Sequence, residues 1–394
     1  MHDSSHAADA GILQGVRVLE LGQVLAGPFA GAIFADLGAE VLKIERVEGG
    51  DDARRMGRDF RHGDAHTFHV FNRGKRSLAL DLTSTEGQQA FERLVATVDI
   101  LIHNLRPGVV GKLGIDGESL CARHPRLIYC EISAFGHVGP LCQSPGYEPL
   151  IQAYSGLSST NGGPDDPPIR MGASVCDQGT GMWAAIGALS MLQRRHLTGR
   201  GGVVQASLLE TAMVWNAQKA DAYQNEGKLP EKHATGHPGL VPYESFDTAD
   251  LPILICCGND RLFAKLATLL GRADWIGDAR YATNRARLQH KDALLAELIP
   301  ILRTETRQTW RTRLDQAGVP CSPVHTIPEA LEQPQLQALA LIQPVPGEDF
   351  KLTGLPVSFD GQRPALRHGA PRLGQDNAAF GLPPAPAPRS DEQP

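Results

Sequence analysis

The stretch that decides the fold is GVRVLELGQVLAGPFAGAIFADLGAEVLKIER, residues 15–46. It begins with an apolar run that is typical of a buried strand. A helical segment follows, which opens at Pro28 and ends near Gly38, and a second apolar run closes the stretch. A strand, a helix and a strand at this spacing predict a βαβ unit, in which the strands pair in parallel and the helix covers the sheet.

The same alternation recurs further along the chain. RSLALDL (76–82), DILIHNL (99–105) and LIYCEISAFG (127–136) predict strands, and GQQAFERLVATV (87–98) predicts a helix. VVQASLLETAMVWNA (203–217) predicts a further strand and helix. We therefore expect an open α/β domain of the doubly wound, Rossmann-like kind.

The character of the sequence changes near residue 221. The segment 225–242 is rich in Gly, Pro, His and Lys, VPYESFDTADLPILICC (241–257) predicts a hairpin, and helical segments follow to about residue 317. We expect five parts. They are a disordered N-terminus (1–11), a large α/β domain (12–222), a linker and small α+β domain (223–325), a return segment that packs on the large domain (326–378) and a disordered tail (379–394).

The composition argues against several classes of protein. The 394 residues carry a formal net charge of -6 without a basic block, so no nucleic-acid or membrane partner is expected. The 7 cysteines show neither a CxxC pair nor the spacing of metal ligands, which is typical of a reducing compartment without a metal site. The start, MHDSSHAADA, lacks the features of a signal peptide, and no apolar window is long enough to span a membrane. We expect a cytoplasmic protein.

A single carboxylate precedes an apolar segment in ASVCDQGTGMWAAIGALSML (173–192). From Met182 onward this segment is apolar on every side, which predicts a helix buried all round. Asp177 could be structural, because aspartate is a preferred helix N-cap, or it could be catalytic, and the spacing alone leaves both open. Cys176 is a second possible nucleophile, but no neighbour in sequence would form its thiolate, which favours a buried structural residue.

Several basic or amide residues flank the predicted strands. Phosphorylated ligands bind at the carboxyl ends of the strands in a doubly wound sheet, so these residues predict a phosphate-rich ligand, with solvated surface charges as the alternative. They are Arg46, Asn72, Lys75, Arg76 and Arg106. The first turn contains Gly22, Gly27 and Gly31, which lack the GxGxxG spacing, so NAD or FAD is not expected.

Six segments resemble, in this order, the class III CoA-transferases, the family of formyl-CoA transferase and carnitine CoA-transferase. They are LAGPFAGAIFADLGAEVLKIER, FNRGKRSLALDL, NLRPGVVGKLGI, GYEPLIQAYSGL, SVCDQGTGMWAAIGAL and TGRGGVVQASLLE. The stretch GHPGLVPYESF is also similar to the family, so the resemblance covers about residues 12–375. It implies an interlocked, ring-like homodimer with active sites between the large and small domains. It also implies acyl-CoA and a carboxylic acid as substrates, with no tightly bound cofactor.

The resemblance further implies roles for individual residues. Asp177 matches the nucleophile of the family, which attacks the acyl-CoA thioester and passes through an aspartyl anhydride and an aspartyl-CoA thioester. A carboxylate suits this task, because it forms anhydrides with acids and so conserves the energy of the thioester. The residues expected to contact CoA are Val24, Leu25, Ala26, Arg46, Asn72, Lys75, Arg76, Asn104 and Arg106. Those expected to contact the substrate are Tyr147, Arg170, Gly179 and His237, with Gly181 helping Gly179 to bring backbone N–H groups to the acyl oxygen.

Two departures from formyl-CoA transferase bear on the substrate. That enzyme carries a glutamine where this chain has Leu25, and a lid of consecutive glycines where this chain has GHPGLVPY (236–243). The resemblance therefore favours an acid larger than formate or oxalate, such as a C4–C6 dicarboxylate or a hydroxy acid, with succinyl-CoA as the donor. Arg170 or His237 could pair with a distal carboxylate of such an acid, or could be merely structural.

α-Methylacyl-CoA racemase, which resembles the same family, is the alternative. It also has an aspartate at the position of Asp177 and uses a histidine in GHDxxY as its second acid/base group. This chain has Tyr147 there, and a tyrosine with an ordinary pKa near 10 is poorly suited to that role near neutral pH.

Overall fold

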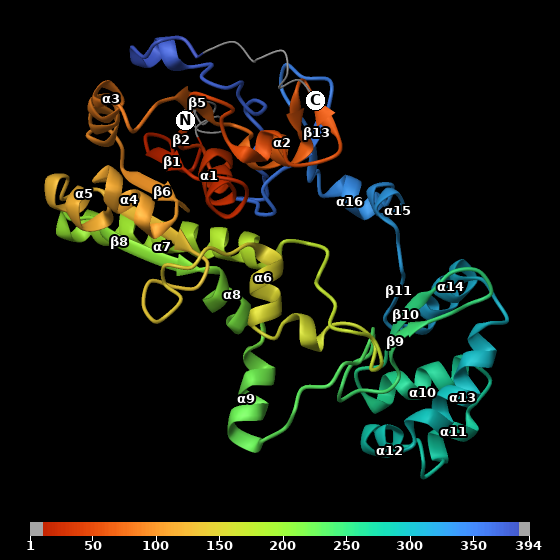
Figure 1. The fold of residues 1–394 in the computed structure, drawn as a ribbon. Coiled ribbons are helices and arrows are strands. Elements are labelled where there is room, and N and C mark those ends of the chain that lie inside the picture. The colour runs from red at the N-terminus through yellow and green to blue at the C-terminus, as the bar shows by residue number, and fades with distance from the viewer. Residues whose placement is uncertain (1–10, 386–394) are drawn as a thin grey trace. The chain divides into compact units, whose positions relative to one another are not determined.

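The structure, a computed structural model, describes residues 11–385 and contains two compact units (Figure 1). The larger unit is built from residues up to 158, from 170–228 and from 337 onward, and the smaller unit from 159–169 and 229–336. The segment 159–169 therefore groups with the smaller unit, whereas the sequence placed it in the large domain.

A parallel sheet of six strands forms the centre of the larger unit, in the order β5-β2-β1-β6-β7-β8. The strands are β1 (Arg17–Leu21), β2 (Glu40–Glu45), β5 (Arg76–Ala79), β6 (Ile100–His103), β7 (Ile128–Ser133) and β8 (Gly202–Ser207). This order begins at the middle strand and reverses direction between β1 and β6, as in doubly wound domains. The predicted α/β fold of the large domain is thus confirmed.

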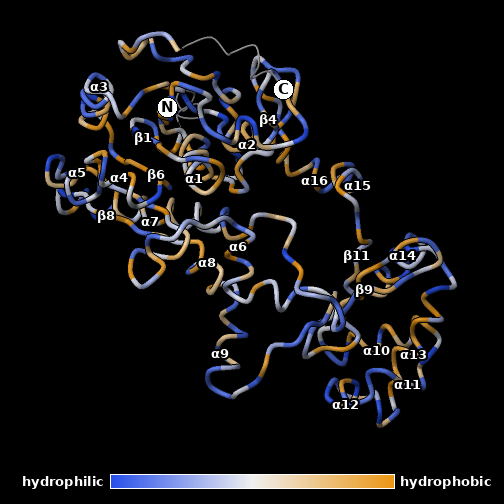
Figure 2. The backbone as a smooth tube through the Cα atoms, in the orientation of Figure 1, coloured by the Kyte–Doolittle hydropathy of each residue, from blue (hydrophilic) through white to orange (hydrophobic). Residues whose placement is uncertain are grey.

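Helices cover both faces of the sheet, which explains why the strands are continuous apolar runs rather than alternating ones. On one face, side chains such as Val18 and Ile102 pack with α1 (Ala26–Asp36) and α7 (Val175–Thr198). The opposite face, with Leu19 and Tyr129, packs with other helices. These are α3 (Thr85–Val95), α4 (Pro107–Leu113) and α5 (Gly117–Arg123). Figure 2 shows the hydrophobic colour along β6 and along α8 (Leu208–Trp215).

The α7 helix differs from its prediction. It begins at Val175, so Asp177 lies within its first turn, and its N-cap is Ser174. It is not buried all round, because Met182, Trp183 and Ile186 are 47%, 42% and 49% exposed. Apart from Leu192 and Arg195, the buried face consists of small residues, which lets α7 pack closely on its neighbours.

The smaller unit combines an antiparallel sheet, in the order β11-β10-β9, with helices. Its strands are β9 (Tyr243–Phe246), β10 (Ile253–Cys256) and β11 (Cys321–Pro323). Its helices include α10 (Asp260–Leu269), α11 (Asp274–Gly277), α12 (Asn284–Gln289), α13 (Lys291–Leu302), α14 (Arg307–Ala317) and α15 (Ile327–Leu331). The pairing of β9 with β10 confirms the predicted hairpin.

The chain then returns to the larger unit through β12 (Ile342–Pro344) and β13 (Lys351–Thr353), which pair with each other. Asn377 binds both the N–H and the carbonyl of Ala79 on β5, and Leu382 is buried in the core of this unit. The predicted disordered tail is therefore wrong for residues 379–385, whereas residues 1–10 and 386–394 lie outside the described residues. None of the helices within 11–385 is long and apolar enough to cross a membrane.

Candidate active site

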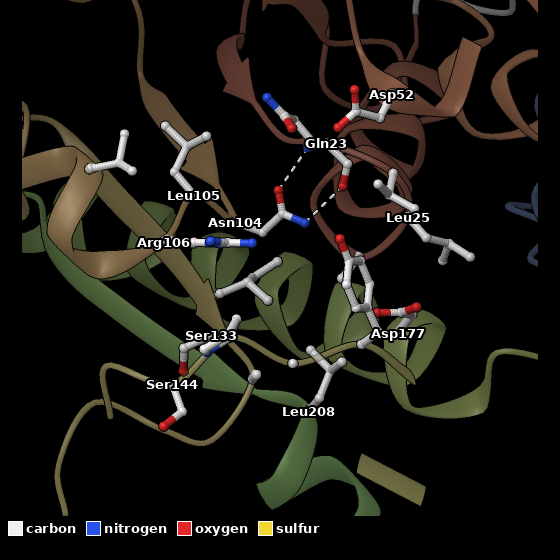
Figure 3. Close-up of a pocket in the computed structure, with 18 of the residues that line it drawn as sticks. Gln23, Leu25, Asp52, Asn104, Leu105, Arg106, Ser133, Ser144, Asp177 and Leu208 are labelled. Atoms are coloured by element: carbon white, nitrogen blue, oxygen red, sulfur yellow. Dashed lines mark hydrogen bonds between the residues drawn. The ribbon is translucent and has the colours of Figure 1, made fainter. Parts of the chain in front are cut away.

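A pocket of about 450 Å³ opens at the carboxyl edge of the parallel sheet, beside the point where the strand order reverses. All of its lining residues belong to the larger unit. They come from the turn after β1, Asp52 in the segment after β2, the segment after β6, the end of β7, the loop before α6 (Glu148–Tyr154) and the first residues of α7 and α8. Figure 3 shows that Arg106 and Asp177 enter this pocket from opposite sides.

The turn after β1 is joined to the segment after β6 by one side chain. Asn104 Oδ1 accepts the N–H of Gln23 at 2.7 Å, and Asn104 Nδ2 donates to the Gln23 carbonyl at 2.8 Å (Figure 3). The amide thus continues the pairing of the two strands by one residue. Val24, Leu25 and Ala26, which follow, lie on the pocket wall, and their contact with CoA stays a prediction.

The α7 N-terminus is held by a buried carboxylate from α6. Glu148 Oε1 accepts the N–H of Cys176 at 3.0 Å, and Glu148 Oε2 accepts the N–H of Asp177 at 2.6 Å. Gln152 Nε2 donates to Glu148 Oε1 at 2.7 Å and fixes its orientation. Glu148 therefore satisfies the free N–H groups of the helix, the role that an N-cap usually has. The Asp177 side chain is left free for other chemistry.

Asp177 is the carboxylate of this arrangement that no other described residue binds. Its carboxylate lies on the pocket wall and makes no hydrogen bond or ion pair within residues 11–385. Burial, and then the nearby charge of Glu148, raise the pKa of Asp177 to about 7. Burial raises the pKa of the Cys176 thiol to about 12, so this cysteine stays protonated and remains a structural residue.

Arg106 and Tyr147 complete the polar lining near Asp177. Arg106 precedes α4, is exposed, and has no ion pair among the residues that the structure describes. Tyr147 precedes α6 and is 63% exposed. Both side chains are available to a bound ligand, and a free guanidinium pairs well with phosphate or carboxylate.

Other residues predicted to contact CoA do not line this pocket. Lys75 is fully buried, and its Nζ lies 2.6 Å from Glu20 Oε2 and donates to Pro28 O at 2.8 Å. Asn72 is also fully buried and accepts from Lys75 Nζ at 2.9 Å. Arg76 begins β5, at the amino edge of the sheet, and pairs with carboxylates. Asn72 and Lys75 precede β5 and Arg76 is its first residue, so none of the three follows a strand at the carboxyl edge as predicted. Their contact with CoA stays a prediction.

Arg46 does follow a strand, β2, but it is paired within the chain. It forms an ion pair with Asp52 and donates to Gly50 O at 3.1 Å. Asp52 lines the pocket, so Arg46 contacts a residue of the pocket wall without lining the pocket itself.

The two helical glycines have a packing role. A Cβ on Gly179 would lie 2.7 Å from Thr211 Cγ2 on α8, and a Cβ on Gly181 would lie 2.8 Å from Ala26 O on α1. Their N–H groups lie inside α7, where such groups bond to the preceding turn. Close helix packing explains their small size, and neither glycine lines the pocket. Their predicted role, to let backbone N–H groups approach the acyl oxygen, stays a prediction.

Two predicted substrate residues lie outside the pocket lining. Arg170 is exposed in the larger unit. His237 is exposed in the smaller unit, where the centroid of its ring lies 5.3 Å from that of Tyr243. Their roles stay predictions.

The sequence reasoning missed two polar groups beside the pocket. Glu148 is the single charged residue of the motif GYEPLIQAYSGL, and this was the available signal. Ser133 lines the pocket and contacts His137 Nε2 at 3.4 Å, while His137 Nδ1 lies 3.1 Å from Glu131 Oε1. The bond to Glu131 raises the pKa of His137. No group of His, Cys, Asp and Glu among residues 11–385 is arranged to hold a metal ion.

Comparison with known proteins identifies the class. The model of CoA-transferase family III matches residues 13–377. The chain is 36% identical to the succinate–glutarate CoA-transferase of Agrobacterium fabrum, over 93% of this chain and 94% of that protein. It is 35% identical to the acetyl-CoA:oxalate CoA-transferase of Acetobacter aceti, over 96% of this chain and 97% of that protein. A CAIB/BAIF family protein from Brucella suis has the same fold, with a TM-score of 0.86, 36% identity and coverage of 94% and 99% of the two chains.

The chain therefore belongs to CoA-transferase family III. It is a CoA-transferase, and CoA thioesters are its substrates.

Proposed function

We propose that this enzyme moves CoA from a succinyl-CoA-type donor to a dicarboxylic acid, with Asp177 as the nucleophile. The observation that carries the proposal is the Asp177 carboxylate, which lies on the wall of the pocket without a partner among residues 11–385. An unpaired, partly buried carboxylate is costly to the fold, and such groups are typical of active sites.

The chemistry proceeds through two covalent states. An Asp177 oxygen attacks the thioester carbonyl, the C–S bond breaks, and CoA leaves as the thiolate, which gives an aspartyl anhydride. The thiolate then attacks the Asp177 carbonyl, so that the donor acid leaves as its carboxylate and an aspartyl-CoA thioester remains. The acceptor carboxylate repeats these two steps in reverse and leaves as acyl-CoA. No proton is gained or lost, and Asp177 is regenerated as the carboxylate.

The pocket supplies what this sequence of steps requires. Leu25 and Leu208 provide apolar surface beside Asp177 (Figure 3), which disfavours water that would hydrolyse the anhydride. Arg106 lines the pocket, and in our proposal it binds a phosphate of CoA or a substrate carboxylate. The role of Val24, Leu25 and Ala26 in our proposal is to contact the thiol arm of CoA.

The acid specificity rests on the departures from formyl-CoA transferase and on the relatives. The two relatives described above are named for glutarate and for oxalate, which are both dicarboxylates. Formyl-CoA transferase carries a glutamine at the position of Leu25. The leucine of this chain therefore favours an acid larger than formate or oxalate. Glutarate and malate therefore form the first panel of acceptors, and oxalate tests the expected preference for a larger acid.

The proposal includes a homodimer whose chains interlock. Large apolar side chains of the larger unit support it, because Met182, Trp183 and Ile186 on α7 and Val214 and Trp215 on α8 are at least 42% exposed. Such a surface is unusual on a monomer and is typical of an interface. Interlocked dimers should not exchange subunits when tagged and untagged forms are mixed, but should exchange after unfolding and refolding together. Rapid exchange under native conditions would contradict interlocking.

The test of the function is a transfer assay that follows each CoA ester by mass spectrometry. Succinyl-CoA with each acid of the panel should yield the new CoA ester and free succinate in equal amounts. A parallel assay with a 2-methylacyl-CoA in deuterated water tests the racemase alternative. Deuterium entry at the α-carbon without an acceptor acid, together with no transfer, would overturn the proposal.

A further inference from the structure

The turn between β1 and α1 is held at three successive residues, Gly22, Gln23 and Val24. Lys43 Nζ donates to the Gly22 carbonyl at 2.7 Å, and the Asn104 amide binds both backbone groups of Gln23. Asp51 Oδ1 accepts the N–H of Val24 at 3.0 Å. Each of these three residues is thus tied to a side chain from another part of the chain.

Val24 needs this restraint because its backbone is strained. Its φ is 65°, in the left-handed region, which a β-branched residue rarely adopts. Glycine would take this conformation without strain, but the residue at this position also lines the pocket. The strained conformation persists because the surrounding contacts fix it.

The groups behind the turn form a rigid support. Asp51 is 2% exposed, and its Oδ2 lies 2.9 Å from Lys43 Nζ, which is fully buried and also 2.9 Å from Glu20 Oε1. Asp51 Oδ1 accepts a second N–H, from Ala53, at 2.9 Å, and the Asp51 N–H donates to Glu45 Oε2 at 3.0 Å. The Asp51 carboxylate can therefore move little without breaking several buried interactions.

We propose that Asp51 is a positioning residue for CoA transfer, which fixes the strained turn at Val24 and so sets the place of Val24, Leu25 and Ala26 on the pocket wall. The inference rests on the proposed function, because it requires acyl-CoA to bind in this pocket. Asp51 itself contacts the turn rather than the substrate.

The first test compares Asp51→Ala with a matched control. Asp51→Ala leaves the Val24 N–H without its acceptor, so the KM for acyl-CoA should rise about tenfold while kcat changes less. Asp36→Ala is the control, because Asp36 is a buried carboxylate of the same unit that pairs with Arg73 and does not line the pocket. It should lower the melting temperature and leave KM unchanged. Equal loss of stability in both variants, with KM unchanged in both, would overturn the inference.

The second test uses rescue by glycine. In the double variant Asp51→Ala with Val24→Gly, residue 24 adopts a positive φ without strain, so KM should return to the value of the Val24→Gly single variant. A KM that stays about tenfold above that single variant would show that Asp51 does not act through the turn.

Asp51→Asn provides the test should Asp51→Ala fail to fold. Asparagine keeps an acceptor for the Val24 N–H but removes the charge, so KM should remain within about twofold of the parent enzyme. A tenfold rise would show that the charge, and not the contact with Val24, is what matters.

Calorimetric binding of CoA to each variant separates this inference from the proposed function. A parent protein that binds CoA without transferring it refutes only the latter, and one that binds no CoA refutes both.

Discussion

Lys75 and Arg106 resemble each other in sequence, since each is basic and flanks a strand of the sheet, but their surroundings are opposite. Lys75 is fully buried and lies 2.6 Å from Glu20 Oε2. Arg106 is exposed on the pocket wall and has no ion pair within residues 11–385. A buried charge must be paired, whereas a charge beside a pocket can await a ligand. Whether a charged side chain has a partner within the chain, rather than how near it lies to a strand, therefore distinguishes a structural residue from a candidate ligand-binding residue.

The carboxylates show the same contrast. Glu20 and Asp51 share Lys43, and burial alone would lower the pKa of that lysine, but the two carboxylates raise it above its usual range. Asp177 has no such cation, and its pKa is raised to about 7 by burial and then by Glu148. Paired carboxylates hold the fold together, and the unpaired one is available for reaction.

The largest effect that this contrast predicts is for Asp177→Asn. Without the nucleophile, transfer should fall by about a thousandfold or more, while CoA still binds within about twofold of the parent affinity. Product CoA ester, measured by mass spectrometry, and calorimetric binding check the two parts. Transfer within tenfold of the parent would remove Asp177 from the mechanism.

Lys75→Met should affect the fold and not the reaction. It takes one of two cations from the buried Glu20, so the free energy of unfolding should fall by about 3 kcal/mol. Urea unfolding measures this loss, and the KM of the folded variant should stay within about twofold of the parent. A tenfold rise in KM with little loss of stability would place Lys75 in the ligand site after all.

Arg106→Ala should do the reverse. Loss of an exposed, unpaired guanidinium leaves stability nearly unchanged but should raise the KM for acyl-CoA about tenfold. Arg106→Lys is the matched control. Its KM should lie between those of the parent enzyme and of Arg106→Ala, because lysine keeps the charge without the forked donors. Steady-state kinetics at two salt concentrations check the charge, since salt weakens the effect. An unchanged KM in Arg106→Ala would make Arg106 a solvated surface charge.

The smallest predicted effect concerns pH. Asp177 must be ionised to attack, so kcat/KM should fall about tenfold for each pH unit below a midpoint near 7. Glu148→Gln removes one of the two causes of the raised pKa, so its midpoint should move to lower pH. Rate profiles for both enzymes test this, and a midpoint that stays fixed or rises in Glu148→Gln would contradict the assigned influence of Glu148.

The sequence predicted the sheet well because its strands are buried on both faces, which leaves a strong apolar signal in residues 15–46. It failed for α7, because Met182 and Ile186 are as apolar as a core residue and only the packing shows that small residues occupy the buried face. The sequence analysis also placed Lys75 at the carboxyl edge of the sheet. Lys75 comes just before β5, and the amino ends of parallel strands lie together at the opposite edge. The cap made by Glu148 joins residues 28 to 29 positions apart, which no local pattern reports.

Covalent capture of Asp177 tests the central claim most directly. The enzyme is incubated with succinyl-CoA, treated with hydroxylamine and digested, and its peptides are mapped by mass spectrometry. Hydroxylamine converts an activated carboxylate into a hydroxamate, so the account predicts this modification on Asp177, dependent on succinyl-CoA and absent from Asp177→Asn. If Asp177 stays unmodified while the enzyme is actively transferring CoA, the account of Asp177 as the nucleophile is contradicted.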